Sequence, residues 1–176
     1  RGALSYTVGS EAWLSDHQSH RLYYDQPGWS GTTFGMEKRI VSRVGDTAGG
    51  STSSPVHEGE TVVYRLTLRN AIDESGETVP LTLSGSDLYD ALPQSIASHR
   101  WSKDNLTLTY GEGCTVTNGD HWEVTDPGSD AQYLRWADDF SITFKDAAHI
   151  YVSLTFPEGL NWQDYANRYG ATTLQN

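Results

Sequence analysis

The clearest alternation of hydrophobic and polar positions lies in residues 59–70, GETVVYRLTLRN. Side chains in a β-strand point alternately to the two faces of a sheet, so every second residue shares a face. One face of this segment carries only apolar or aromatic side chains: Val62, Tyr64, Leu66 and Leu68. The pattern predicts a half-buried antiparallel strand that ends in a turn at Asn70.

A second informative segment is residues 87–93, DLYDALP. It predicts a short strand from Leu88 to Leu92 that stops at Pro93, because proline has no N–H to donate to the next rung of a sheet. The strand carries an acidic residue, Asp90, between apolar neighbours.

Short apolar segments separated by turn residues continue along the chain, and no long segment has helical periodicity. Residues 96–101 and 162–169 could each hold one or two helical turns. Many short strands with turns between them predict an all-β protein, an immunoglobulin-like antiparallel β-sandwich. The further predicted strands are Met36–Val44, Val79–Leu83, Leu106–Tyr110, Thr115–Thr117, His121–Val124, Tyr133–Trp136, Phe140–Phe144, Ile150–Phe156 and Tyr169–Leu174.

The chain divides into two parts by pattern. Residues 37–176 carry the regular series of strands and are predicted to form the sandwich. Residues 1–36 are rich in turn signals and could be the end of a preceding domain, an addition packed on the sandwich, or a linker. The chain starts without methionine or the apolar core of a signal peptide, so we expect it to be a piece of a longer protein.

Charge and composition narrow the classes of function. The net charge of −11 argues against a nucleic-acid partner, because the phosphate backbone would be repelled. No apolar run is long enough to span a membrane. The single cysteine, Cys114, excludes an internal disulfide and is expected to be buried as a small hydrophobe.

Residues 59–70 and 87–93 together resemble the signature of repeat domains in Gram-positive surface proteins, which include the isopeptide-forming domains of pilins and adhesins. Residues 133–136, 140–144 and 150–159 resemble, in their order and spacing, a run of strands in the C-terminal part of the same domains. The resemblance covers about residues 37–176. It implies an extracellular stalk or adhesin module of the bacterial cell wall, which is not an enzyme and needs no cofactor. Its partners would be neighbouring domains of the same surface protein, and they could include a host matrix protein or a glycan.

Isopeptide-forming domains of this family join a lysine on the first strand to an asparagine on the last strand, with an acidic residue between them. By resemblance, the three positions here are Lys38, Asp90 and Asn167. The sequence departs from the family at the last strand, where Ala171 follows the asparagine by four positions instead of two. Asn176 and Asn161 are therefore alternatives for the third position.

The chemistry explains these residue types. A lysine amine with its ordinary pKa of about 10.4 is protonated and cannot attack, but burial in an apolar core favours its neutral form. The same burial raises the pKa of a carboxyl, which can then donate a hydrogen bond to the asparagine carbonyl and polarise it. Attack by the amine expels ammonia and leaves an amide.

Other interpretations stay open from the sequence. Lys38, flanked by Glu37 and Arg39, could be an ordinary surface charge on a sandwich without a crosslink. Six tryptophans are many for 176 residues. We expect Trp136 in the core, and exposed aromatics around Trp101 and Trp122 or in residues 1–36 could instead define a carbohydrate-binding module of a secreted protein. A hydrolase is a more distant possibility, and no spacing of histidines or carboxylates predicts a metal site.

Overall fold

The computed structural model describes residues 4–7, 12–14, 34–44, 55–70, 77–95, 99–126, 131–160, 162–169 and 173–176. Strands dominate these residues and most pair antiparallel, which confirms the prediction of an all-β protein. The helical elements among them are one α-helix and two short 3₁₀ turns (η1, Gly85–Asp87, and η2, Lys103–Asn105). No helix in this part of the chain is long and apolar enough to cross a membrane. The immunoglobulin-like topology stays a prediction.

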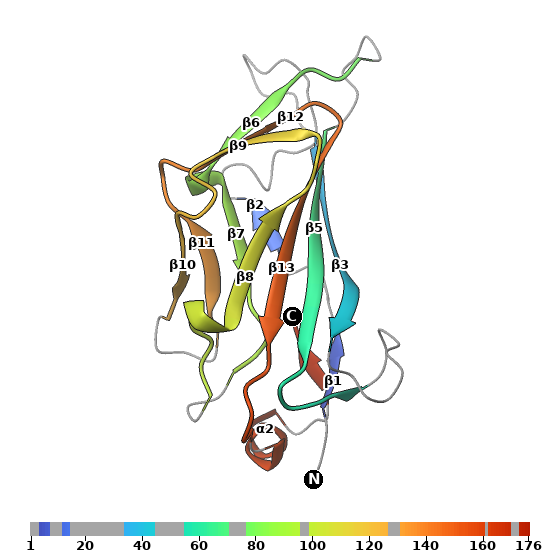
Figure 1. Ribbon diagram of the computed structural model, residues 1–176, viewed down its shortest axis with the longest axis vertical. Coiled ribbons are helices and arrows are strands. Elements are labelled where there is room, and N and C mark those ends of the chain that lie inside the picture. Colours follow the sequence, from blue (N-terminus) through green and yellow to red (C-terminus); the bar gives the residue numbers. More distant parts are fainter. Residues whose placement is uncertain are drawn as a thin grey trace.

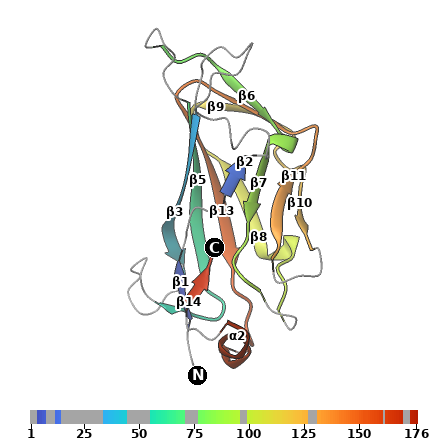
Figure 2. The ribbon, with the colours of Figure 1, turned by 180° about the vertical axis from the view of Figure 1, so that it is seen from behind.

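Two four-stranded sheets form the body of the molecule and lie against each other (Figures 1 and 2). The longer sheet has, in spatial order, the strands β3 (Phe34–Val44), β5 (Thr61–Asn70), β13 (Ala147–Thr155) and β8 (Leu106–Tyr110). The second sheet has the order β10 (Trp122–Thr125), β11 (Tyr133–Trp136), β7 (Leu88–Ala91) and β2 (Ala12–Leu14).

Two smaller sheets lie toward the ends of the body. One crosses the end opposite to the helix (Figure 1) and contains β6 (Leu81–Ser84), β12 (Ser141–Phe144) and β9 (Cys114–Thr117). The other joins the two ends of the chain and contains β14 (Thr173–Gln175), β1 (Leu4–Thr7) and β4 (Pro55–Val56). In this last sheet β1 pairs with β14 in parallel.

Strands from the first 36 residues are part of the same sheets as the rest of the chain. β1 pairs with β14 and β4, and β2 pairs with β7. β3 begins at Phe34, two residues earlier than the predicted strand. These three pairings tie the N-terminal segment to strands that lie within residues 37–176.

The core lies between the sheets and is formed by the inward-facing side chains of strands such as β5. The alternation seen in the sequence is confirmed, since Val62, Tyr64 and Leu68 are fully buried and Leu66 is nearly so. Trp136 is buried as predicted, at 5% exposure. Burial of such side chains contributes about 1.5–3 kcal/mol each, which makes this interior the main source of stability.

The α-helix, α2 (Trp162–Tyr169), explains the main error in the predicted strands. The segment Tyr169–Leu174 was predicted as one strand, but Tyr169 ends the helix and β14 begins only at Thr173. Asp164 in the first turn and Arg168 in the last turn both favour a helix, because their charges oppose the helix dipole. Tyr165 anchors the helix to the core and is 1% exposed.

Candidate functional site

Lys38 points into the interior because of its place in β3. It pairs in register with Leu66, a core residue of β5, and therefore shares the inward face of the sheet. Its neighbours Glu37 and Arg39 lie on the opposite face, where they form an ion pair with each other. The Lys38 side chain is only 1% exposed, so the interpretation of this residue as a surface charge is wrong.

Asp90 reaches the same place from the second sheet. β7 is hydrogen-bonded on both sides, with Asp90 opposite Leu134 of β11 and Ala12 of β2. Its side chain is completely buried, and its Oδ1 lies 2.7 Å from the Nζ of Lys38. The structure thus brings together two residues that are 52 positions apart in the sequence.

Asn176 completes a cluster around the lysine amine. Its Oδ1 accepts a hydrogen bond from Lys38 Nζ at 2.8 Å, and the residue is 2% exposed. The backbone oxygen of Ala91 accepts a further hydrogen bond from Nζ at 2.9 Å. The C-terminal end of the described chain reaches the Lys38 amine because β14 lies beside β1. Both views show this end, marked C, near the middle of the longer sheet (Figures 1 and 2).

The prediction of Asn167 as the third residue is corrected by this geometry. Asn167 lies on α2, is exposed, and accepts a hydrogen bond from Gln163 at 2.9 Å. The reason is the helix: residues two apart on a helix do not share a face, so the burial of Tyr165 turns Asn167 outward. Asn176, one of the alternatives from the sequence, takes its place, and Asn161 lies outside the described residues.

Tyr64 is a fourth member of the cluster that the sequence analysis did not assign. Its hydroxyl donates a hydrogen bond to Oδ2 of Asp90, and its ring centroid lies 4.7 Å from Lys38 Nζ. One sequence signal could have found it, because a tyrosine on an otherwise apolar strand face needs a polar partner for its hydroxyl when buried.

The electrostatics of the cluster favour neutral groups. Burial raises the pKa of Asp90 above its ordinary value, and the charge of Lys38 and the hydrogen bonds from Lys38 and Tyr64 act in the opposite direction. An ammonium–carboxylate pair and an amine–carboxylic acid pair differ only by one proton moved along the 2.7 Å hydrogen bond. A dry interior penalises two charges far more than two neutral groups, so it favours the second form.

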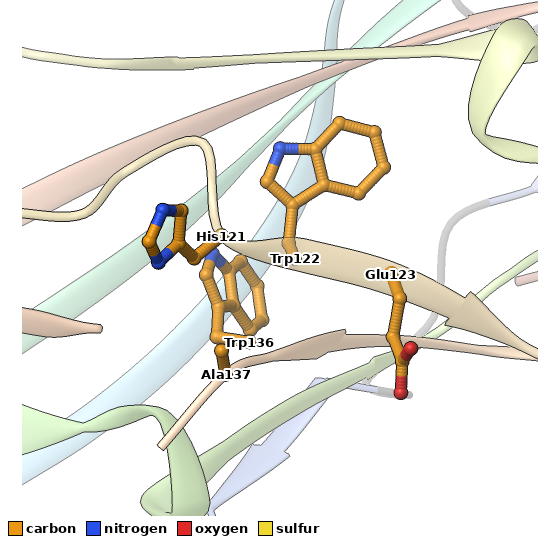
Figure 3. Close-up of a pocket in the computed structure, with 5 residues that line it drawn as sticks. All are labelled: His121, Trp122, Glu123, Trp136 and Ala137. Atoms are coloured by element: carbon orange, nitrogen blue, oxygen red, sulfur yellow. The ribbon is translucent and has the colours of Figure 1, made fainter. Parts of the chain in front are cut away.

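A shallow cavity of about 310 Å³ lies elsewhere, on β10 and β11 (Figure 3), and is lined by His121, Trp122, Glu123, Trp136 and Ala137. Trp122 projects from one side of β10 and Glu123 from the other (Figure 3). Trp122 is partly exposed, and the amine of Lys103 lies 4.4 Å from its ring centroid.

The expectation of exposed aromatics around Trp101 is wrong. Trp101 is 3% exposed, and its indole N–H donates to the backbone oxygen of Pro93 at 2.9 Å. The side chains of Trp13, Trp29 and Trp162 lie outside the described residues. Trp122 is therefore the one tryptophan with a partly exposed side chain among those whose burial the structure describes.

Within the described residues, no group of three or more histidine, cysteine, aspartate or glutamate side chains could hold a metal ion.

Cys114 is only partly buried, contrary to expectation, and its thiol donates a hydrogen bond to the backbone oxygen of Gly111 at 3.2 Å. Cys114 lies in β9, where partly buried and exposed side chains alternate, so its side chain is only partly covered by the core.

Comparisons of the chain with models of protein families, with characterised proteins and with solved structures found no match. What the protein does is therefore inferred from the cluster of Lys38, Asp90 and Asn176 and from the resemblance of its sequence motifs.

Proposed function

We propose that Lys38 and Asn176 become joined by an intramolecular isopeptide bond, and that the domain is an extracellular structural or adhesive module of a Gram-positive surface protein. The observation that carries the proposal is the buried amine of Lys38, which contacts both a buried carboxyl and a buried side-chain amide. The motif resemblance predicts the same chemistry for Lys38 and Asp90.

The reaction balances with the groups present. The neutral amine of Lys38 attacks Cγ of Asn176, the new Nζ–Cγ bond forms, and the Cγ–Nδ2 bond breaks. One proton leaves Nζ and one reaches Nδ2, so that ammonia departs and a secondary amide remains. Asp90 carries these protons: as an acid it polarises the Asn176 carbonyl, and as a base it then accepts the proton from Nζ.

The distances suit this step. Nζ lies 2.8 Å from Oδ1 of Asn176, and a C=O bond is about 1.23 Å long, so Cγ lies within about 4 Å of the attacking nitrogen. Reacting atoms held about 3–3.5 Å apart are close to an attack geometry, so a small shift suffices. The hydrogen bond to Ala91 O holds one N–H and limits rotation of the amine.

A permanent buried ion pair is the competing explanation for these contacts. Such a pair costs several kcal/mol of desolvation per ion, which its attraction recovers only in part. The amide would remove both charges and leave one polar group next to Asp90. This difference in free energy favours the crosslink as the end state of the cluster.

The bond would have a direct mechanical effect. It would link β3 to the residue after β14, across 138 positions of sequence. The chain-entropy model assigns closure of such a loop about 5 kcal/mol of stabilisation. Tension that enters at β3 and leaves at Asn176 would pass through the bond and not through the strands between, which suits a stalk whose partners are neighbouring domains of the same protein.

Intact mass of the folded protein and its variants tests the proposal. The wild type and Asn167→Ala should both weigh one ammonia less than their sequences, since Asn167 lies on the exposed side of α2. Lys38→Ala, Asp90→Ala and Asn176→Ala should each show the full mass. Full mass in the wild type would refute the crosslink, and loss of the shift in Asn167→Ala alone would reassign the asparagine.

A carbohydrate-binding module is the second candidate, and the cavity beside Trp122 favours it. Partly exposed aromatic rings can stack on sugars, and the polar side chains of His121 and Glu123 also line the cavity. The test is a titration with soluble cell-surface glycans, followed by the backbone amide NMR signals of β11, which both the wild type and Trp122→Ala retain. Shifts in the wild type that vanish in Trp122→Ala support this candidate, and unchanged spectra reject it.

A further inference from the structure

We infer that Tyr64 is a positioning residue for the crosslinking reaction: its hydroxyl fixes the orientation of Asp90 and keeps the transferable proton on the oxygen that faces Lys38. The inference rests on the proposed isopeptide bond. It adds a residue to the site and predicts how the rate of crosslinking depends on pH.

The contacts divide the two carboxyl oxygens of Asp90 between different partners. Oδ1 contacts the amine of Lys38, and Oδ2 accepts the hydrogen bond from the Tyr64 hydroxyl. Tyr64 is fully buried on the inward face of β5, so packing on all sides fixes its ring. Its hydroxyl thus holds the plane of the carboxyl in one orientation.

This arrangement decides where the proton of the carboxylic acid resides. An oxygen that accepts a hydrogen bond from Tyr64 is the carbonyl-like oxygen of the acid, so the acidic proton sits on Oδ1. Oδ1 and the Asn176 oxygen both contact the same nitrogen, at 2.7 and 2.8 Å. The proton is therefore available on the side where the amide carbonyl must be polarised.

Without the hydroxyl, the acid could carry its proton on either oxygen and could rotate about its Cβ–Cγ bond. Only one of those arrangements serves the reaction. The hydrogen bond from Tyr64 also stabilises the ionised carboxyl and so lowers the pKa of Asp90 against the effect of burial. Tyr64 consequently influences both the geometry of the acid and the pH at which it loses its proton.

The reactive state contains one proton shared by the pair of Lys38 and Asp90. The rate of crosslinking should form a plateau in pH, falling at low pH, where the pair gains a proton, and at high pH, where it loses one. Removal of the Tyr64 hydroxyl makes Asp90 harder to ionise. The alkaline limb of the profile should then move to higher pH while the plateau falls.

The test starts from chain purified unfolded from inclusion bodies, in which the crosslink has not formed. Folding is started by dilution at a series of pH values, samples are quenched in acid, and the loss of ammonia is followed by mass spectrometry. Tyr64→Phe keeps the ring and removes only the hydroxyl. Tyr110→Phe is the matched control, because it removes another tyrosine hydroxyl with a hydrogen bond, to Gly119 O, outside this cluster.

Tyr64→Phe should slow crosslinking about tenfold on the plateau, the factor expected for one lost buried hydrogen bond, and move the alkaline limb upward. Tyr110→Phe should retain the wild-type rate and profile. An unchanged rate in Tyr64→Phe, or a rate that falls by the same factor at every pH, would overturn the inference. A wild type that never loses ammonia would instead refute the proposed function, and with it the reaction that Tyr64 would serve.

A second measurement covers the case in which Tyr64→Phe fails to fold. In the Asn176→Ala chain, which cannot crosslink, carbon-13 NMR can follow the carboxyl of Asp90 and Cζ of Tyr64 during a pH titration. If the hydroxyl binds the carboxyl, both signals should shift with one common midpoint. A Tyr64 signal that does not respond when Asp90 titrates would contradict the inference.

Discussion

The amine of Lys38 lies 2.7 Å from a carboxyl oxygen of Asp90, although the two residues belong to different sheets. Both side chains are almost completely buried. Neither residue could be ionised alone at this depth without a large cost in free energy, so each depends on the other. The strand alternation that buries the apolar residues on either side of Lys38 and Asp90 also points these two side chains into the interior, where they contact each other.

The crosslink and the buried pair should contribute separately to stability. Asn176→Ala removes the crosslink, which corresponds to about 5 kcal/mol, together with one acceptor of the Lys38 amine, whereas Asp90→Ala removes the crosslink and leaves that amine buried without its carboxyl, at a further cost of about 3–5 kcal/mol. The melting temperatures should therefore fall in the order wild type, Asn176→Ala, Asp90→Ala. Asp138→Ala, at an exposed position, is the control and should melt like the wild type. Equal melting of all four chains would contradict both contributions.

The period of two in the sequence was enough to predict the all-β class, whereas Lys38 and Asp90 were singled out by the resemblance of motifs, and Lys38 stayed open as a surface charge. Each has apolar residues two positions away, as Met36 and Ile40 lie on either side of Lys38. The third residue could not be predicted in this way. The choice of Asn176 depends on a helix that displaces Asn167 and on the parallel pairing of β14 with β1, both of which are set by long-range packing.

Tyr64 shows a second limit of sequence reasoning. The alternation predicted that its ring would be buried, and it is. Which polar group its hydroxyl would contact depends on the distance between the two sheets, which the pattern of a single strand does not contain. Trp101 illustrates the opposite case, since turn residues around it suggested exposure, whereas contacts with Pro93 and Phe156 bury it.

Gly85 should be intolerant of any side chain. A Cβ atom at this position would lie 1.8 Å from the backbone oxygen of Ala137, which cannot move without breaking the neighbouring turn. Gly85→Ala should lower the free energy of unfolding by about 1–3 kcal/mol, the usual cost of overpacking, as measured by denaturant unfolding. Gly35→Ala is the control, because no atom lies within 4 Å of its Cβ position. A Gly85→Ala chain as stable as Gly35→Ala would refute the predicted clash.

Gln132 should be important for anchoring the segment before β8. Its side chain is buried and makes two hydrogen bonds with the backbone of Trp101, accepting from N at 2.7 Å and donating to O at 2.8 Å. Gln132→Leu keeps a similar volume but leaves both backbone groups unpaired, which should cost about 2–4 kcal/mol in the free energy of unfolding. Gln163→Leu, at an exposed position on α2, should cost little. Equal stability of the two variants would contradict the prediction.

His99 should make stability depend on pH in mildly acidic solution. Burial lowers its pKa below the ordinary value of 6.5, so the unfolded chain binds the proton more readily than the folded one. The free energy of unfolding should therefore decrease as pH falls below about 6.5 and stop decreasing once pH is below the folded pKa. His99→Phe keeps an aromatic ring beside Trp101 and should reduce this slope between pH 6.5 and 5. An identical slope in both chains would show that other groups cause it.

The most direct measurement of the central claim is the location of the crosslink in the folded wild-type protein. Proteolytic digestion followed by tandem mass spectrometry should yield one branched peptide that joins Lys38 to Asn176 and is lighter than the sum of its two component peptides by one ammonia. More simply, the intact chain should be lighter than its sequence by one ammonia, and that loss should map to these two residues. Separate, unmodified peptides containing Lys38 and Asn176, together with an unshifted intact mass, would contradict the account.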